Sequence, residues 1–205
     1  MQLSASEENG KLLVEVKGLE LPVANAIRRY AMSHVPVLAI EKITMYENSS
    51  QLFDEYLAHR IGLLPIKTPK GLPASAEITF TLDEVGPKKV YAVNLKSSDA
   101  GISVAEPGIP IGTLFEEQAL RLEGVATLGT GREHAKHQAG VVSYEDKEDG
   151  TLVIKAESFL SMSAKEMLLR GCDVLEKELA ALSKEVSKLG GKKPAKEAKK
   201  TKKKK

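Results

Sequence analysis

Apolar and polar residues alternate in several short stretches of the chain, and each such stretch predicts a half-buried strand. Over residues 11–17, for example, Leu12, Val14 and Val16 share one face, while the charged residues fall on the other. The acidic turn at 145–150 predicts that the two stretches flanking it form a hairpin. The ranges predicted as strands are 11–17, 37–46, 76–82, 90–95, 119–128, 141–144 and 152–156. Residues 114–119 are expected to form one or two helical turns.

Helical spacing appears in three places. Pro22 suits the first turn of a helix, where its missing N–H costs nothing, and Pro36 ends the same helix. Residues 53–66 alternate charged and apolar side chains up to a glycine and a proline, which predicts a short helix, then a turn and the start of a strand. A solvated amphipathic helix alone accounts for that pattern as well.

The third helix begins at Ser163, whose hydroxyl and the carboxylate of Glu166 have capping-box spacing. Apolar residues then recur at alternating steps of four and three, which is a heptad seam about three heptads long. The seam comprises Leu168, Cys172, Leu175, Leu179, Leu182, Val186 and Leu189. So narrow a seam suggests pairing with another long helix, and the alternative is a terminal helix packed on its own domain.

Composition restricts the class of protein. A chain of 205 residues is enough for one large domain or two small ones. Only nine residues are Phe or Tyr and none is Trp, which disfavours a stacking platform for single-stranded nucleic acid. The lone Cys172 fits a reducing compartment, and no stretch has the length of a membrane span or the character of a signal peptide. We therefore expect a soluble, cytoplasmic protein.

The net charge of +2 averages two different regions. Residues 192–205 hold nine Lys and one Glu, which is +8, whereas residues 1–191 hold 21 basic and 27 acidic residues, which is −6. The mildly acidic body offers no general attraction to phosphate. We expect the tail, 191–205, to be disordered, either as a solubilising extension or as a weak, salt-sensitive nucleic-acid contact.

The chain lacks a legible set of catalytic or metal-binding groups. Its single cysteine and four scattered histidines do not have the spacing of zinc ligands. The pair Gly129 and Gly131 is followed by Arg132 rather than by the lysine of a phosphate loop. There is also no acidic cluster of the kind that holds catalytic magnesium. We expect no catalytic residue, no metal and no cofactor.

Three segments carry a family resemblance. They are Ala24-Asn25-Ala26-Ile27-Arg28-Arg29, Phe53-Asp-Glu-Tyr-Leu-Ala-His-Arg-Ile-Gly-Leu-Leu-Pro-Ile66 and Gly129-Thr-Gly-Arg-Glu-His-Ala-Lys136. Their strings and order resemble the D-subunit family of archaeal RNA polymerase, which is related to the bacterial alpha subunit and the third-largest eukaryotic subunit. The resemblance spans roughly residues 10 to 190. It departs from the family after Lys136, where His137 and Ala139 stand in place of the usual Trp and Pro.

The resemblance implies an α+β fold. It implies a split dimerisation domain, residues 1–46 and 138–190, with an inserted β-rich domain at 47–137. Some members of the family carry an iron–sulfur domain, but this chain has no cysteine before Cys172 and resembles the cluster-free form. The magnesium of the polymerase belongs to the largest subunit.

The implied function is assembly of a DNA-directed RNA polymerase. Such a subunit pairs with the L subunit, gathers the small N and P subunits and docks the second-largest subunit, with the largest as a further candidate. It meets DNA only within the complex or weakly through the tail, and it meets no membrane. The resemblance and the heptad together nominate these partner-binding residues: Asn25, Arg28, Arg29, His59, Arg60, Leu168, Cys172, Leu175, Leu179, Leu182 and Val186.

Adjacent arginines on a helix point about 100° apart, so Arg28 and Arg29 cannot face the same neighbour. One of them is free to bind a partner carboxylate, unless both are simply solvated. Two other kinds of function stay open at this point. One is a stand-alone nucleic-acid-binding protein that uses the basic tail, and the other is an enzyme whose catalytic groups come from distant segments.

Overall fold

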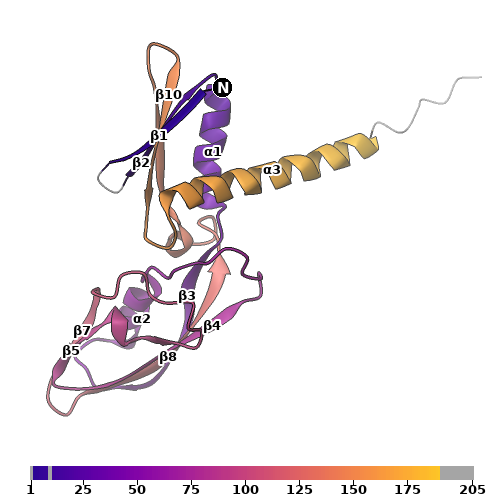
Figure 1. The fold of residues 1–205 in the computed structure, drawn as a ribbon. Coiled ribbons are helices and arrows are strands. Elements are labelled where there is room, and N and C mark those ends of the chain that lie inside the picture. Colours follow the sequence, from indigo (N-terminus) through magenta and orange to yellow (C-terminus); the bar gives the residue numbers. More distant parts are fainter. Residues whose placement is uncertain (1, 9–10, 190–205) are drawn as a thin grey trace, which may run out of the picture.

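The computed structural model describes residues 2–8 and 11–189, and within them helices and antiparallel strands build an α+β fold. The strands form two four-stranded sheets and one two-stranded sheet (Figure 1). The predicted fold class is confirmed. The tail predicted at 191–205 lies outside the described residues.

The first sheet has the strand order β1-β2-β10-β9. It contains the strand and the hairpin predicted from alternation, and Leu12 and Val16 are buried as expected. The outer strand β1 was not predicted from the sequence, and every residue in it is exposed. The strand bounds are β1 Gln2–Glu8, β2 Lys11–Lys17, β9 Gly140–Asp146 and β10 Thr151–Ser158.

The second sheet has the order β3-β8-β4-β6, and a small sheet of β5 and β7 lies beside it. Its central strand β8 pairs with β3 on one side and with β4 on the other. The bounds are β3 Val37–Asn48, β4 Glu77–Val85, β5 Lys88–Tyr91, β6 Lys96–Ser97, β7 Pro110–Leu114 and β8 Ala119–Gly129.

The elements predicted over 90–95 and 114–119 were wrong. The strand expected over 90–95 stops at Tyr91, and the chain then turns through a short 3-10 helix, η1 (Ala92–Asn94), which the Asn94 side chain closes by accepting a hydrogen bond from Tyr91 N. The helical turns expected over 114–119 are instead the tight connection between β7 and β8. In that connection Gln118 Oε1 accepts a hydrogen bond from Phe115 N.

The buried side chains form two hydrophobic cores. One is drawn from residues between Leu38 and Leu128, and the other from residues before Leu38 together with residues after Gln138. Strand β3 belongs to both, because Val37 lies in the second core while Leu38 and Ile40 lie in the first. Successive strand residues face opposite sides, so one strand can serve two cores. The domain boundaries proposed from the sequence remain a prediction.

Two of the three helices follow the sequence signals closely. Helix α1 (Leu21–Ser33) has Pro22 in its first turn and buries Ala24 and Ala31, of which Ala31 belongs to the second core. Helix α2 (Asp54–Gly62) carries two acidic residues in its first turn and buries Leu57 and Ile61 in the first core. After α2 the chain forms only an isolated bridge, Ile66 to Val104, where a strand start was expected.

The longest helix is α3 (Ala164–Leu189), which crosses α1 and then extends away from the body (Figure 1). Ser163 Oγ caps it by accepting a hydrogen bond from Glu166 N at 3.1 Å, as predicted. The Glu166 carboxylate bonds Arg170 rather than reaching back, so only half of the capping box forms. A Cβ on Gly171 would lie 2.8 Å from Ala31 Cα, so a glycine is needed where the two helices touch.

Replacing Gly171 with alanine should therefore destabilise the protein, although alanine normally favours a helix. Overpacking of a close contact costs about 1–3 kcal/mol, and for a chain of this size each kcal/mol corresponds to about 2–4 °C in Tm. Thermal unfolding followed by circular dichroism measures the change. Gly62→Ala is the matched control, because a Cβ there meets only Ile40 O at 3.5 Å. A Gly171→Ala protein as stable as the parent would contradict the close-contact account.

Candidate partner-binding surface

Arg28 and Arg29, which both belong to the segment of residues 24–29 that carries the family resemblance, have different surroundings on α1. Arg28 is half-buried, and its Nε and Nη2 both donate to Asn25 Oδ1, at 3.2 and 3.0 Å. Arg29 is exposed, and its side chain makes no hydrogen bond or ion pair among the described residues. Asn25 and Arg28 thus satisfy one another within the helix, and Arg29 is the arginine available to a partner.

The segment of residues 129–136, which also carries the family resemblance, packs against the end of α1. Arg132 N donates to Ser33 O at 3.1 Å, and its Nη1 lies 3.4 Å from His34 Nε2. The His34 ring in turn stacks on Tyr30, with centroids 4.1 Å apart. A cavity of about 390 Å³ opens here, lined by Ala26, Arg29, Tyr30, Ser33, His34 and Arg132.

This cavity, which we term the Arg29–Arg132 site, carries two guanidinium groups and no carboxylate in its lining. A nearby acid, Glu178 on α3, is engaged by the Tyr30 hydroxyl, and that hydrogen bond raises the pKa of Tyr30 above its ordinary value. Guanidinium groups bind carboxylates through paired, charge-assisted hydrogen bonds. The Arg29–Arg132 site is therefore suited to an acidic side chain from another polypeptide.

The segment of residues 53–66, which contains α2, lies apart from this site. Arg60 Nε donates to Pro110 O at 2.8 Å, so this arginine braces α2 against β7 within the chain. His59, the residue before it, is exposed. The structure thus brings the first and third segments together and leaves the α2 pair separate.

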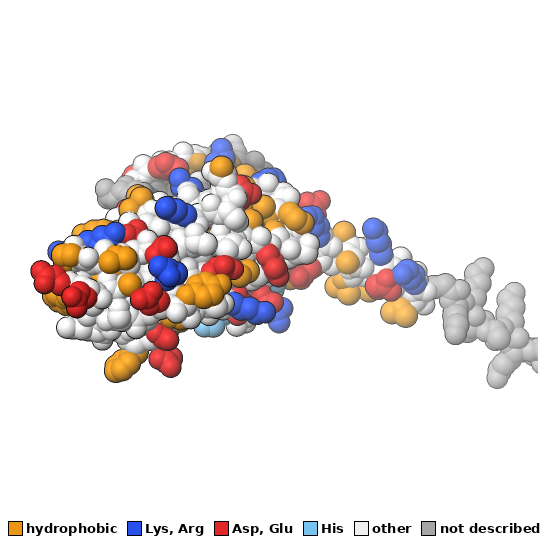
Figure 2. Space-filling view, turned by 90° about the horizontal axis from the view of Figure 1, so that it is seen from below, with side chains coloured by type: hydrophobic (Ala, Val, Ile, Leu, Met, Phe, Trp, Pro, Cys, Tyr) orange, Lys and Arg blue, Asp and Glu red, His pale blue; other side chains and the backbone are white. Residues whose placement is uncertain are grey.

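The predicted heptad seam divides along α3. Leu168 packs on the second core, and Cys172 and Leu175 are half-buried, where burial raises the pKa of the Cys172 thiol. Beyond them the seam is uncovered. Leu179, Leu182 and Val186 are 56%, 61% and 56% exposed. Figure 2 shows hydrophobic side chains along the part of α3 that projects from the body.

The seam is not the face of α3 that packs on α1. Met167, Gly171 and Glu178 mark the packed face and fall within about 40° of one another at 100° per residue. The seam residues centre about 70° further round the helix. The helix can therefore pack on its own domain and present the seam to a second helix at the same time.

The sequence pattern did not indicate that His137 is a buried, structural residue. His137, at the end of the 3-10 helix η2 (Ala135–His137), is 4% exposed, and its Nδ1 lies 2.8 Å from Val37 O. A Cβ on Gly129 would lie 2.6 Å from its Nε2, so glycine makes room for the ring. The one sequence signal was the departure from the family pattern at His137.

Glu41 joins this histidine to Lys136. Its Oε2 lies 2.5 Å from Lys136 Nζ and 3.6 Å from His137 Nε2. The Lys136 hydrogen bond lowers the pKa of Glu41 below its ordinary value, and His137 adds to the effect. These three residues link β3 to η2 at the junction of the two cores.

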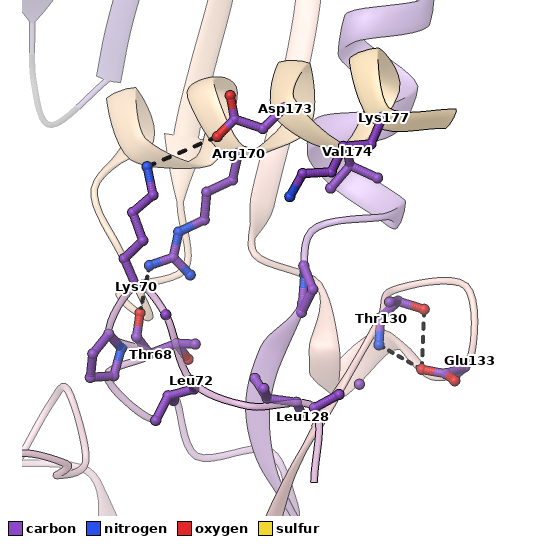
Figure 3. Close-up of a pocket in the computed structure, with 15 residues that line it drawn as sticks. Thr68, Lys70, Leu72, Leu128, Thr130, Glu133, Arg170, Asp173, Val174 and Lys177 are labelled. Carbon is purple, nitrogen blue, oxygen red and sulfur yellow. Dashed lines mark hydrogen bonds and ion pairs between the residues drawn. The ribbon is translucent and has the colours of Figure 1, made fainter. Parts of the chain in front are cut away.

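Polar contacts also join α3 to the loop that contains Thr68 and Lys70. Figure 3 shows Arg170 reaching Thr68 O, at 3.0 Å, while Lys70 Nζ lies 3.9 Å from Asp173. Across the same cavity, Glu133 accepts from Thr130 N at 2.7 Å. These contacts brace the loop against the helix, and the cavity that the residues line has a volume of about 520 Å³.

No group of three metal-ligating side chains is arranged around a common point in residues 2–8 and 11–189. In the same part of the chain, none of the helices combines the length and apolar character needed to cross a bilayer.

These features define the class of the chain as an α+β protein with two cores and a projecting helix whose apolar seam is uncovered. Residues 41–157 match the family model described as the RNA polymerase Rpb3/RpoA insert domain, and the chain belongs to that family. The match runs from β3 to β10 and so includes the hairpin of the first sheet.

Curated relatives carry the name DNA-directed RNA polymerase subunit Rpo3. The protein from Methanocaldococcus jannaschii is 42% identical over 160 residues, which is 77% of this chain and 82% of that protein. The protein from Thermococcus kodakarensis is 42% identical over 137 residues, 63% of this chain and 53% of that protein. The protein from Natronomonas pharaonis is 41% identical over 139 residues, 68% of this chain and 56% of that protein. The alignment thus spans about half the length of the last two.

The lowered pKa of Glu41 predicts an acid-sensitive contribution to stability. A depressed carboxyl pKa stabilises the fold above the unfolded pKa, and this contribution is lost as pH falls through the folded value. Because the Glu41 side chain is 48% exposed, we expect Glu41→Gln to cost only about 0.2–1 kcal/mol at pH 7. The deficit in Tm should vanish at a pH well below 4.5, the ordinary value. Glu148→Gln, in an exposed turn, is the control. If Glu41→Gln lowers Tm by the same amount at pH 7 and at the acidic pH, the linkage is refuted.

Proposed function

We propose that this chain is a non-catalytic assembly subunit of an archaeal-type DNA-directed RNA polymerase, the nucleotidyltransferase complex of transcription. In this proposal it pairs with a smaller L-type subunit, and the pair is the platform for the catalytic subunits. The observation that carries the proposal is the uncovered apolar seam on the projecting half of α3. The polymerase subunits among its relatives supply the context.

The geometry of α3 supports helix pairing. Exposed apolar side chains in a continuous row are unfavourable in a monomer and usually mark an interaction surface. A second helix laid along Leu179, Leu182 and Val186 would bury them in the manner of a coiled coil. The half-buried residues Leu168, Cys172 and Leu175 would continue the same contact toward the body.

The Arg29–Arg132 site supports a second kind of contact within the same assembly. Arg29 and Arg132 line the same cavity, whereas Arg28 is held by Asn25. We assign Arg29 rather than Arg28 to a partner carboxylate. For His59 and Arg60, the exposed imidazole is the better candidate for an intersubunit contact, because Arg60 already bonds Pro110 O.

The remaining partners of the proposal are the small N and P subunits, the second-largest subunit and, as a further candidate, the largest. The proposal places the protein in the cytoplasm and gives it no metal, cluster or other cofactor of its own. A stand-alone nucleic-acid-binding function gains no support, since residues 1–191 carry a net charge of −6 and the relatives are polymerase subunits.

Replacing Leu179 with aspartate should abolish capture of the L-type subunit while leaving the chain folded. The side chain is exposed in the isolated protein, but in the pair it would be a buried charge without a partner. Co-purification of tagged protein with the L-type subunit measures the loss. Lys177→Asp is the matched control, because it adds the same carboxylate about 160° round the helix. Normal capture by a folded Leu179→Asp protein would refute pairing through the seam.

Substitutions of Arg28 and Arg29 should have different effects, because Arg28 has a structural role and Arg29 binds a partner. Arg28→Ala removes both hydrogen bonds to Asn25, so we expect a loss of stability of about 0.5–1.5 kcal/mol and little change in assembly. Arg29→Ala should leave Tm unchanged and weaken assembly of the larger complex, with Arg132→Ala behaving alike. Tm and yield of reconstituted polymerase are the two readouts. If Arg28→Ala alone impairs assembly, the assignment is reversed.

A further inference from the structure

The apolar seam on the projecting half of α3 is bordered by carboxylates. At 100° per residue, Glu176 lies about 90° from the centre of the seam on one side, and Glu178 and Glu185 lie about 70° and 90° from it on the other. Such positions flank the apolar contact in paired helices, where charged residues decide which partner is chosen. Within residues 176–189, every charge at a flanking position is negative.

The lysines of the same half of α3 lie on the opposite face. Lys177, Lys184 and Lys188 fall about 150–170° from the centre of the seam. Residues 176–189 hold three Glu and three Lys, so this half of the helix is neutral overall while its charges are separated by face. The nine lysines of residues 192–205 come after Leu189 in the chain and do not flank the seam of residues 176–189.

The three carboxylates differ in what they contact within the chain. The Tyr30 hydroxyl donates a hydrogen bond to Glu178, which holds that carboxylate on the side of the seam toward α1. Glu185 lies 2.6 Å from Lys188, but both side chains are 69% exposed, and an exposed ion pair contributes little. Glu176 makes no side-chain hydrogen bond or ion pair with another described residue. Glu176 and Glu185 are therefore the carboxylates that a cation on a partner can reach.

The acidic border disfavours pairing of α3 with a second copy of this chain. In an antiparallel pair of identical helices, each flank of the seam lies against the same flank of the other copy, so carboxylates would face carboxylates. In a parallel pair, each flank lies against the opposite flank, which is also acidic, so no carboxylate would meet a cation. Charges that flank a helical seam select partners in this way, by repulsion as well as by attraction. The seam therefore calls for an occupant with positive flanks.

We propose that the occupant of the seam is a helix whose own apolar seam is flanked by lysine or arginine, and that Glu176 and Glu185 select it over a second copy of this chain. The inference rests on the proposed assembly function, in which the occupant belongs to the L-type subunit, and it adds the charge chemistry of that helix. Leu179, Leu182 and Val186 supply the apolar contact, and the two carboxylates decide which helix makes it.

The test measures affinity of the full-length chain for the L-type subunit of the same organism. Glu176→Lys combined with Glu185→Lys should weaken binding about tenfold at low salt, because two attractive contacts become repulsive. In 1 M salt, where the Debye length is about 3 Å, the double variant and the parent should differ by less than about twofold. Lys177→Glu combined with Lys184→Glu is the matched control, since it reverses two charges on the opposite face and should keep the affinity. Circular dichroism establishes that each variant is folded.

A second measurement separates a direct charge contact from damage to α3. Replacing the basic residues that flank the seam of the L-type helix with glutamate should restore binding of the doubly reversed variant and weaken binding of the parent. Glu176→Gln combined with Glu185→Gln removes the attraction without adding repulsion, so its loss should be smaller, about threefold at low salt. The parent chain alone should sediment as a monomer at low salt, where repulsion between the acidic borders is screened least.

Equal affinity of the doubly reversed variant and the parent at low salt would overturn the charge selection and leave the assembly function intact. An L-type helix with no basic residue beside its seam would have the same consequence, and so would a stable dimer of the parent chain through α3 at low salt. If the parent chain does not bind the L-type subunit at either salt concentration, the assembly function itself fails, and this inference fails with it.

Discussion

The structure depends on a short buried segment that serves two cores. Val35 and Val37 pack into the core under α1 and the first sheet, while Leu38 and Ile40 pack into the core of the second sheet. This division follows from the alternation of side chains along an extended chain. Because the segment is common to both cores, the two halves of the molecule cannot be displaced without unpacking it.

Because this segment joins the two cores, the end of α1 and the loop at 129–136 lie close together although they are distant in the sequence. The end of α1 precedes this segment, and the loop from Gly129 to Lys136 returns to it as β8 ends. Arg29 and Arg132 are therefore neighbours although more than a hundred residues separate them. The Glu41, Lys136 and His137 contacts fix the same junction from the other side. The three sequence segments therefore form two sites in the structure. The segments at 24–29 and 129–136 meet at the Arg29–Arg132 site, and the segment at 53–66 lies separately on α2.

The sequence predicted the elements with strong local signals and missed those without them. The capping serine and the heptad spacing identified α3, and Pro22 identified the start of α1. Strand β1 was missed because it is exposed throughout, and the fate of residues 92–94 depends on the Asn94 side chain. Which of two adjacent arginines is free depends on Asn25, and the burial of His137 depends on the missing side chain at Gly129. These are tertiary contacts that periodicity does not encode.

The central claim is that the projecting half of α3 is one side of an intersubunit interface. Amide hydrogen exchange of the chain, alone and with the L-type subunit, tests it most directly, because exchange reports local opening residue by residue. The account predicts that residues 176–189 of α3 exchange quickly in the isolated chain and are strongly protected in the pair, while β5 and β7 are unchanged. A stable pair in which that part of α3 exchanges as fast as in the free chain would contradict the account.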